Sequence, residues 1–227
     1  MPIDPERVKV ICFDIDGTLA DTDDQMAEKL ANFLPRPFFS SFKRLAFARK
    51  LLMAIETPAN KILYLLDKIG LDDRFYKLRA KLFPRRKTEK PNWRLIPGVS
   101  KTLAHLAKNY SLAIISVREA HLTQSFIHQS GLTPFIHHWA SAETTPHTKP
   151  YPDPIHWIAQ RFGVTSGECL MVGDTTVDIL AGKHAGAQTV GVLSGFGEEM
   201  ELWEAGADEV IGDVNALGSL LKVSSPD

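Results

Sequence analysis

The fold of this chain is decided by one stretch near its start, Val8-Lys9-Val10-Ile11-Cys12-Phe13-Asp14-Ile15-Asp16-Gly17-Thr18. Apolar residues dominate the stretch as far as Phe13, and two carboxylates, a glycine and a threonine follow at once. Apolar runs of this length are typical of strands buried on both faces of a parallel sheet. We therefore predict a buried strand over 8–13 that carries Asp14 to its end.

Further apolar runs downstream have the same form. They are Leu112 to Ile115 followed by Ser116, Cys169 to Val172 followed by Gly173 and Asp174, Gln188 to Leu193 followed by Ser194, and a shorter edge candidate, Asp208 to Ile211. Helical periods lie between them, at residues 100–109, 121–129, 152–162, 177–185 and 214–221. This alternation predicts an α/β fold with a doubly wound parallel sheet. The polar residues that end the strands then gather at the carboxyl edge of the sheet, where open α/β folds bind ligands.

Residues 19–94 interrupt the alternation with a purely helical pattern, which prolines divide into about four helices. We therefore predict an α/β core formed by residues 1–18 and 95–227, and a smaller all-helical cap domain at 19–94 above the carboxyl edge. The insertion holds 17 Lys plus Arg and 9 Asp plus Glu, whereas the rest of the chain holds 9 Lys plus Arg and 18 Asp plus Glu. The basic surface of the cap either attracts anions or is a solvated helical face.

The overall composition is that of a globular protein with balanced charge. The chain has 227 residues, 26 Lys plus Arg against 27 Asp plus Glu, and 44% hydrophobic residues, which excludes disordered, collagen-like and coiled-coil classes. The pattern contains neither a signal sequence nor a membrane-spanning apolar stretch, so we expect a cytoplasmic protein without a membrane partner. Cys12 and Cys169 lie inside apolar runs, which favours buried strand residues over a disulfide, a metal cluster or a catalytic thiolate.

Asp14 and Asp16 form the strongest local signal for chemistry. Two carboxylates this close at the end of a strand repel each other unless a cation or a shared proton offsets the charge, and a divalent metal is the simplest answer. Gly17 permits a turn with positive φ that brings the backbone close to a ligand, and Thr18 adds a hydroxyl. The alternative is an ordinary acidic surface loop or helix cap.

A second acidic segment, Gly173-Asp174-Thr175-Thr176-Val177-Asp178, follows another predicted strand and leads into a helix. Asp174 and Asp178 stand near the positive end of that helix, so one interpretation is helix capping. Capping accounts for one aspartate better than for two, because Asp178 is expected to lie past the capping turn. The other interpretation is a ligand site.

Ser116 and Lys149 complete the set of polar residues near the predicted strand ends. Ser116 alone fits a strand-end or capping serine. Lys149 lies between Thr148 and Pro150 in a proline-rich loop, whose stiffness suits a charge that meets an anion in a fixed geometry. A solvated loop lysine is the alternative.

Taken in order, these four segments resemble the motifs of the haloacid dehalogenase superfamily of phosphohydrolases. Asp14-Ile15-Asp16-Gly17-Thr18 is similar to its first motif, Ser116 to its second, Lys149 to its third, and Gly173-Asp174 through Asp178 to its fourth. Two supporting phrases also match, Ile96-Pro97-Gly98-Val99 and Ala185-Gly186-Ala187. The helical insertion after the first motif resembles the cap of the phosphoglycolate-phosphatase-like branch.

The resemblance implies a phosphatase mechanism with Mg²⁺ as cofactor. Asp14 is then the nucleophile that forms an aspartyl-phosphate, and Asp16 is the general acid and base. The resemblance implies metal ligation by Asp14, the Asp16 backbone carbonyl and Asp174, and binding of the phosphate by Asp14, Gly17, Thr18, Ser116, Val117 and Lys149. Asp178 and Thr175 lie behind this set, where Asp178 orients Lys149 or a water ligand of the metal.

The acidic residue at position 16 favours phosphate esters over halides and phosphonates as substrates, because only an ester leaving group needs its proton. A small phosphorylated metabolite is the expected partner, nucleic acid is disfavoured, and the chain is expected to be a monomer or a weak homodimer. The segment Val117-Arg118-Glu119 departs from the pattern of the branch, and Arg118 either binds a second anion or pairs with Glu119. A phosphomutase and a non-catalytic domain regulated by phospho-aspartate remain the alternatives.

Overall fold

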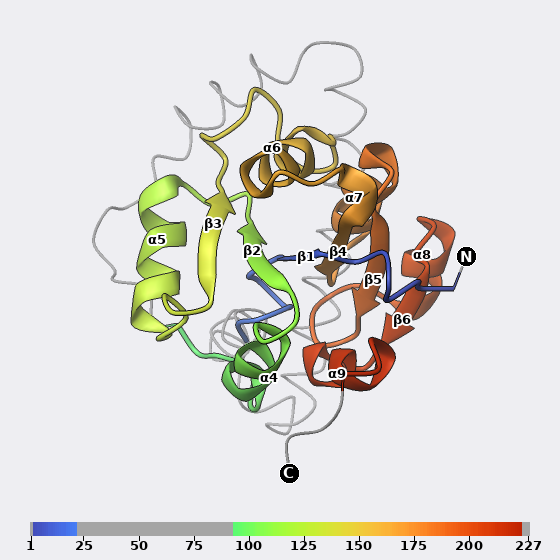
Figure 1. Cartoon of the computed structure of the whole chain (residues 1–227), viewed down its shortest axis with the longest axis horizontal. Coiled ribbons are helices and arrows are strands. Elements are labelled where there is room, and N and C mark those ends of the chain that lie inside the picture. The colour runs from blue at the N-terminus through green and yellow to red at the C-terminus, as the bar shows by residue number, and fades with distance from the viewer. Residues whose placement is uncertain (1, 22–92, 224–227) are drawn as a thin grey trace, which may run out of the picture. The chain divides into compact units, whose positions relative to one another are not determined.

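The computed structural model of the protein describes residues 2–21 and 93–223, which belong to one compact unit of the chain. In this part of the chain, parallel strands form one sheet in the order β3-β2-β1-β4-β5-β6 (Figure 1). The strands are β1 (Val10–Phe13), β2 (Ser111–Ile115), β3 (Ile136–Ala140), β4 (Cys169–Gly173), β5 (Gln188–Val192) and β6 (Glu209–Ile211). Because β1 lies in the middle and the chain winds outward in both directions, the predicted doubly wound α/β fold is confirmed.

Helices cover both faces of this sheet. They are α4 (Val99–Leu106), α5 (Ala120–Gln129), α6 (Asp153–Phe162), α7 (Thr176–Ala185), α8 (Glu199–Glu204) and α9 (Leu217–Leu220), with 3₁₀ turns at Ser166–Glu168 and Val214–Ala216. The helices α6 and α7 pack on one face, and α4, α5 and α9 pack on the other. Figure 1 shows α6 and α7 on the opposite side of the strands from α4 and α9.

The central strand β1 is buried on both faces because its side chains alternate between two hydrophobic clusters. Val10 and Cys12 pack with α6, whereas Ile11 and Phe13 pack with α4 and α5. All four side chains are at most 1% exposed. This two-sided burial explains why the strand reads as an apolar run rather than an alternating pattern, and it fixes the position of the residues that follow.

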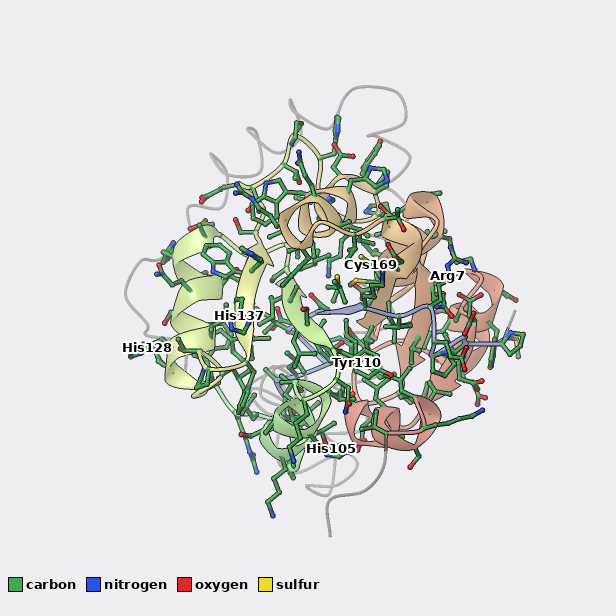
Figure 2. All side chains as sticks on the ribbon, in the orientation of Figure 1. Arg7, His105, Tyr110, His128, His137 and Cys169 are labelled. Atoms are coloured by element: carbon green, nitrogen blue, oxygen red, sulfur yellow. The ribbon has the colours of Figure 1, made fainter. Side chains whose placement is uncertain are left out.

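The predicted cysteine environment is also found. Cys12 and Cys169 are both buried with free thiols, and Cys169, the first residue of β4, lies inside the molecule (Figure 2). The hydrogen bond to Cys169 raises the pKa of the Cys12 thiol, and burial raises it further. These thiols are therefore part of the core that supports β1 and β4.

The sequence patterns missed β3 and α8. The strand β3 contains His137 and His138, and only its two terminal residues, Ile136 and Ala140, are buried. His137 lies on this edge strand (Figure 2) and is exposed, whereas the ring of His138 packs edge-on against Phe162 at 4.7 Å. A strand with one half-open face carries no continuous apolar run, so the pattern did not reveal β3. The helix α8 is too short to show a helical period, because it has six residues and one buried side chain, Leu202.

The chain leaves and re-enters this unit at neighbouring points. Ala20 forms a bridge with Leu95, and the Asp21 N–H donates to the Arg94 carbonyl at 2.8 Å. The predicted cap and its basic runs lie outside the described residues, apart from the ends of the insertion at 19–21 and 93–94, so the cap domain stays a prediction. None of the helices in the described segments is long and apolar enough to cross a membrane.

Candidate active site

The polar residues that end the strands meet at the carboxyl edge of the sheet, as parallel pairing requires. Asp14 follows β1, Ser116 follows β2, Asp174 follows β4, and Lys149 lies in the connection between β3 and α6. Each of these side chains is at most 7% exposed. The Asp14 N–H donates to the Val172 carbonyl at 3.0 Å, so the hydrogen bonding of β1 with β4 extends to Asp14 itself.

Lys149 lies between two carboxylates. Its Nζ is 2.6 Å from Asp14 Oδ1 and 2.5 Å from Asp178 Oδ1, and the Lys149 side chain is 3% exposed. These charge-assisted bonds order three side chains from three separate segments of the chain. The lysine is therefore part of a buried polar network rather than a solvated loop residue.

Asp178 also caps helix α7, contrary to the expectation that it lies past the capping turn. Its Oδ2 accepts hydrogen bonds from the Thr175 N–H at 3.1 Å and the Thr175 hydroxyl at 2.7 Å, and the two residues form a capping box. Asp178 occupies the third helical position, from which a side chain can reach back to the residue that caps the helix. One oxygen therefore caps the helix while the other holds Lys149.

The buried cluster carries more negative than positive charge. Ligand oxygens of Asp14, Asp174 and Asp178 lie within 4.8 Å of one another, and Lys149 supplies one compensating ammonium. Burial raises the pKa of Asp14 to about 7, with Lys149 acting against this shift and Asp178 and Asp16 adding to it. Burial alone lowers the pKa of Lys149, but the carboxylates of Asp14 and Asp178 outweigh it and hold that pKa above its ordinary value.

This donor set fits a hard divalent cation. When all three are ionised, the buried carboxylates beside one ammonium leave an excess of two negative charges, and oxygen ligands of this kind suit Mg²⁺. The cluster brings together two of the predicted metal ligands, Asp14 and Asp174, and adds Asp178. The Asp16 carboxylate is bonded to Arg118 instead, and metal ligation by the Asp16 backbone carbonyl stays a prediction.

Asp174 is positioned by Thr18, which the sequence had singled out as a phosphate ligand, and by a loop that it had not singled out. Its Oδ2 accepts from the Phe196 N–H at 3.1 Å, and its Oδ1 accepts from the Thr18 hydroxyl at 3.4 Å. Gly195 and Gly197 pass so close to Asp174 that a Cβ on either would overlap it. The Ser194-Gly195-Phe196-Gly197 loop after β5 is therefore part of the site, and its two glycines were the available signal.

The turn after β1 has the conformation that the sequence predicts. Gly17 has φ of 72°, which L side chains adopt rarely, and its N–H donates to the Ala20 carbonyl at 2.9 Å. The Ser194 hydroxyl donates to the Gly17 carbonyl at 2.7 Å. This turn separates the side chains of Asp14 and Asp16, so that the two carboxylates take different partners.

Asp16 forms a two-point ion pair with Arg118. Arg118 Nε lies 2.6 Å from Asp16 Oδ2, and one terminal guanidinium nitrogen lies 2.6 Å from Asp16 Oδ1. The Arg118 N–H also donates to the Ser116 hydroxyl at 3.2 Å, and the intervening Val117 side chain is 53% exposed. The sequence had flagged Arg118 but had not predicted Asp16 as its partner, because the contact joins segments 102 residues apart.

A sequence profile of the haloacid dehalogenase-like hydrolase family matches residues 11–192, which is most of the chain and includes all four motif segments. This chain is a haloacid dehalogenase-like hydrolase. The prediction of that family is therefore confirmed.

Two relatives of the hydrolase match it over nearly their whole length. One is the pyrophosphatase PpaX of Anoxybacillus flavithermus, 27% identical over 219 residues, with 96% of this chain and 99% of the relative covered. The other is a phosphoglycolate phosphatase of Photobacterium profundum, 27% identical over 234 residues, with 96% and 98% covered. Both relatives bear phosphatase names, which agrees with the prediction of a phosphatase-type enzyme.

Solved structures agree with the fold. A haloacid dehalogenase-like family hydrolase from Streptococcus pneumoniae superposes with a TM-score of 0.62 at 19% identity, covering 94% of this chain and 98% of its own. The hydrolase YfnB from Bacillus subtilis, bound to magnesium, superposes with a TM-score of 0.66 at 18% identity, covering 96% and 100%. At these identities the likeness concerns the fold.

Proposed function

We propose that this hydrolase is a Mg²⁺-dependent phosphomonoesterase that works through an aspartyl-phosphate on Asp14. The observation that carries the proposal is the buried cluster in which Asp14 meets Lys149 and the carboxylates of Asp174 and Asp178. Such a cluster suits phosphoryl transfer, because a nucleophilic carboxylate and cationic groups must converge on one phosphate.

The residues divide the work as follows. Asp14 attacks phosphorus while Lys149, together with the hydroxyl of Ser116, stabilises the charge that develops on the transferring oxygens. Asp178 holds Lys149 in place, and Thr175 holds Asp178. The Lys149 ammonium already contacts Asp14, so it can donate a hydrogen bond to the phosphoryl oxygens while the Asp14 oxygen bonds to phosphorus.

The proposed metal ligands are Asp14, Asp174 and the backbone carbonyl of Asp16. When bound, Mg²⁺ supplies charge neutralisation between the nucleophile and the phosphate. Thr18 and the Phe196 N–H keep the Asp174 carboxylate oriented toward this site. In the proposal the backbone N–H of Val117 donates to a phosphate oxygen, whereas Gly17, whose N–H is bonded to the Ala20 carbonyl, shapes the turn beside the phosphate.

We propose a small phosphorylated metabolite as the substrate. The names of the relatives, phosphoglycolate phosphatase and pyrophosphatase, supply the first compounds to test. The acid and base role of Asp16 in this proposal fits an ester whose leaving oxygen needs a proton.

The test is release of inorganic phosphate from a panel of phosphorylated metabolites with and without Mg²⁺, run beside the Asp14→Asn variant. We expect release that depends on Mg²⁺ and is lost in the variant. Acid quenching of a reaction with ³²P-labelled substrate should leave label on the wild-type protein that hydroxylamine removes. Label that persists in the variant would overturn the covalent assignment, and transfer of label to a second sugar phosphate without free phosphate would indicate a mutase.

A further inference from the structure

Arg118 occupies an unusual place beside the proposed general acid. Its guanidinium donates to both oxygens of the Asp16 carboxylate, each at 2.6 Å. The same guanidinium lies 4.8 Å from the centre of the Trp93 ring, and that ring packs edge-on against Phe126 at 5.2 Å. Hydrogen bonds from its own N–H to Ser116 and from the Ala142 N–H to its carbonyl fix its backbone.

This ion pair is incompatible with the step that Asp16 has to perform. A general acid must hold a proton on one carboxylate oxygen and present it to the leaving oxygen of the substrate. In the pair, both oxygens of Asp16 are acceptors for Arg118, and the guanidinium lies where the proton would be held. The structure therefore describes a resting arrangement that has to open before an ester is cleaved.

Water can reach this pair. The side chains of Arg118 and Asp16 are 30% and 28% exposed, so solvent can hydrogen-bond to both partners when they separate. A ligand anion that offers two oxygens in the same geometry can therefore replace Asp16 as the partner of Arg118. A neutral ligand group cannot.

Resting on the proposed function, we propose that Arg118 recognises a second anionic group of the substrate, next to the leaving oxygen, and thereby releases Asp16. Asp16 can then act in its proposed role: a proton passes from its carboxyl group to the leaving oxygen as the bond between that oxygen and phosphorus breaks and the bond from Asp14 to phosphorus forms. Arg118 is thus a specificity-determining residue that couples recognition of the anion to the availability of the acid. Carboxylates and phosphoryl groups share the chemistry that it recognises.

The experiment compares three substrates in the wild type and in Arg118→Met. The substrates are 2-phosphoglycolate, pyrophosphate and 2-hydroxyethyl phosphate, which replaces the carboxylate of phosphoglycolate by a neutral hydroxymethyl group. We expect the variant to lose about 10- to 100-fold in kcat/KM on the anion-bearing substrate and less than about 3-fold on 2-hydroxyethyl phosphate. The substrate that suffers the larger loss, phosphoglycolate or pyrophosphate, identifies the second group as carboxylate or phosphoryl.

Two further variants serve as controls. Arg161→Met removes another stacked arginine, which lies 4.7 Å from the Trp157 ring, and should leave all three rates unchanged. Arg118→Lys keeps the charge without the planar fork and should retain part of the preference, which separates recognition from misfolding. Calorimetric titration of phosphoglycolate and pyrophosphate into Asp14→Asn and into Asp14→Asn with Arg118→Met should show a matching loss of affinity without turnover.

Equal losses on all three substrates in Arg118→Met would mean that Arg118 only orients Asp16, and the inference would be wrong while the proposed phosphatase stands. Undiminished affinity for both anion-bearing ligands in the calorimetric pair would also overturn it. A wild-type protein that releases phosphate from none of the metabolites in the panel would instead overturn the proposed function, and this inference with it.

Discussion

Lys149 Nζ lies 2.6 Å from Asp14 Oδ1 at a depth where the lysine side chain is 3% and the aspartate side chain 10% exposed. The same ammonium meets Asp178 on its other side. The cation that we propose to act on the phosphate is therefore held in position by protein carboxylates. The arrangement also makes the stability of the core depend on a residue that we propose to be catalytic.

Lys149→Met should lower the free energy of unfolding by about 3–5 kcal/mol, because it leaves buried carboxylates without their cation. Urea unfolding at neutral pH without Mg²⁺ measures this loss. Lys9→Met is the matched control, since the side chains of Lys9 and Glu168 are 62% and 23% exposed in their pair and the loss of an ion pair that water reaches should change stability far less. Similar losses in both variants would contradict the view that burial makes the Lys149 pairs important.

Asp14 should make the stability of the metal-free protein fall as pH rises from about 4 toward about 7. The pKa of Asp14 is raised from 3.8 to about 7 by burial, so in this window the folded state binds more protons at this site than the unfolded state. The stability that the raised pKa contributes is therefore fully present below about pH 4, and it is lost as the pH rises through about 7.

The measurement for Asp14 is the difference in unfolding free energy between the wild type and Asp14→Asn, followed from pH 4.5 to 8 without Mg²⁺. Taking the difference removes the contribution of the histidines that titrate in the same range. We expect a slope of up to about 1 kcal/mol per pH unit in the wild type relative to the variant. Parallel curves would show that Asp14 does not titrate in this window.

Asp16→Asn should impair alkyl phosphates far more than p-nitrophenyl phosphate. An alkoxide leaving group needs a proton, so kcat of the variant on alkyl phosphates should fall about 10²- to 10⁴-fold. The p-nitrophenolate group leaves without a proton, so kcat on that substrate should change little. Steady-state rates on both substrates test this, with circular dichroism to confirm folding. If the two substrates lose activity to the same extent, Asp16 is not the general acid.

Gly173→Ala should lower kcat by about 10- to 100-fold, because it displaces the Asp178 side chain that holds Lys149. Small displacements of groups in an active site have effects of this size. A Cβ at Gly173 would overlap the Asp178 side chain, which would have to move away from Lys149. Gly212→Ala is the control, because a Cβ there meets nothing within 4 Å. Comparable rates in both variants would show that the site tolerates displacement of Asp178.

Much of the fold could be predicted from local pattern, because the central strands are buried on both faces. The runs ending at Asp14, Ser116 and Asp174 became β1, β2 and β4, and the edge strand β6 lies where it was expected. The strand β3 could not be found in this way, since His137 is exposed and His138 packs against a single aromatic ring.

For the site, the sequence could predict which residues converge but not how they pair. Parallel strand order brings Asp14, Ser116 and Asp174 to one edge, whereas Lys149 reaches that edge from the connection between β3 and α6. The contact of Asp178 with Thr175 is local and has the spacing of a capping box. The contact of Asp178 with Lys149 and that of Arg118 with Asp16 join segments 29 and 102 residues apart, which no local spacing encodes.

Divergence among related chains can concentrate between residues 21 and 93 without disturbing the sheet. Leu19 and Asp21 are hydrogen-bonded across to Ile96 and Arg94, so the two ends of the insertion are tied together within the core itself. The entropy of closing a loop grows only slowly with its length, and here the closure is made by the flanking backbone. Evolution could therefore lengthen, shorten or exchange the inserted segment while the sheet and the buried cluster around Asp14 are inherited unchanged.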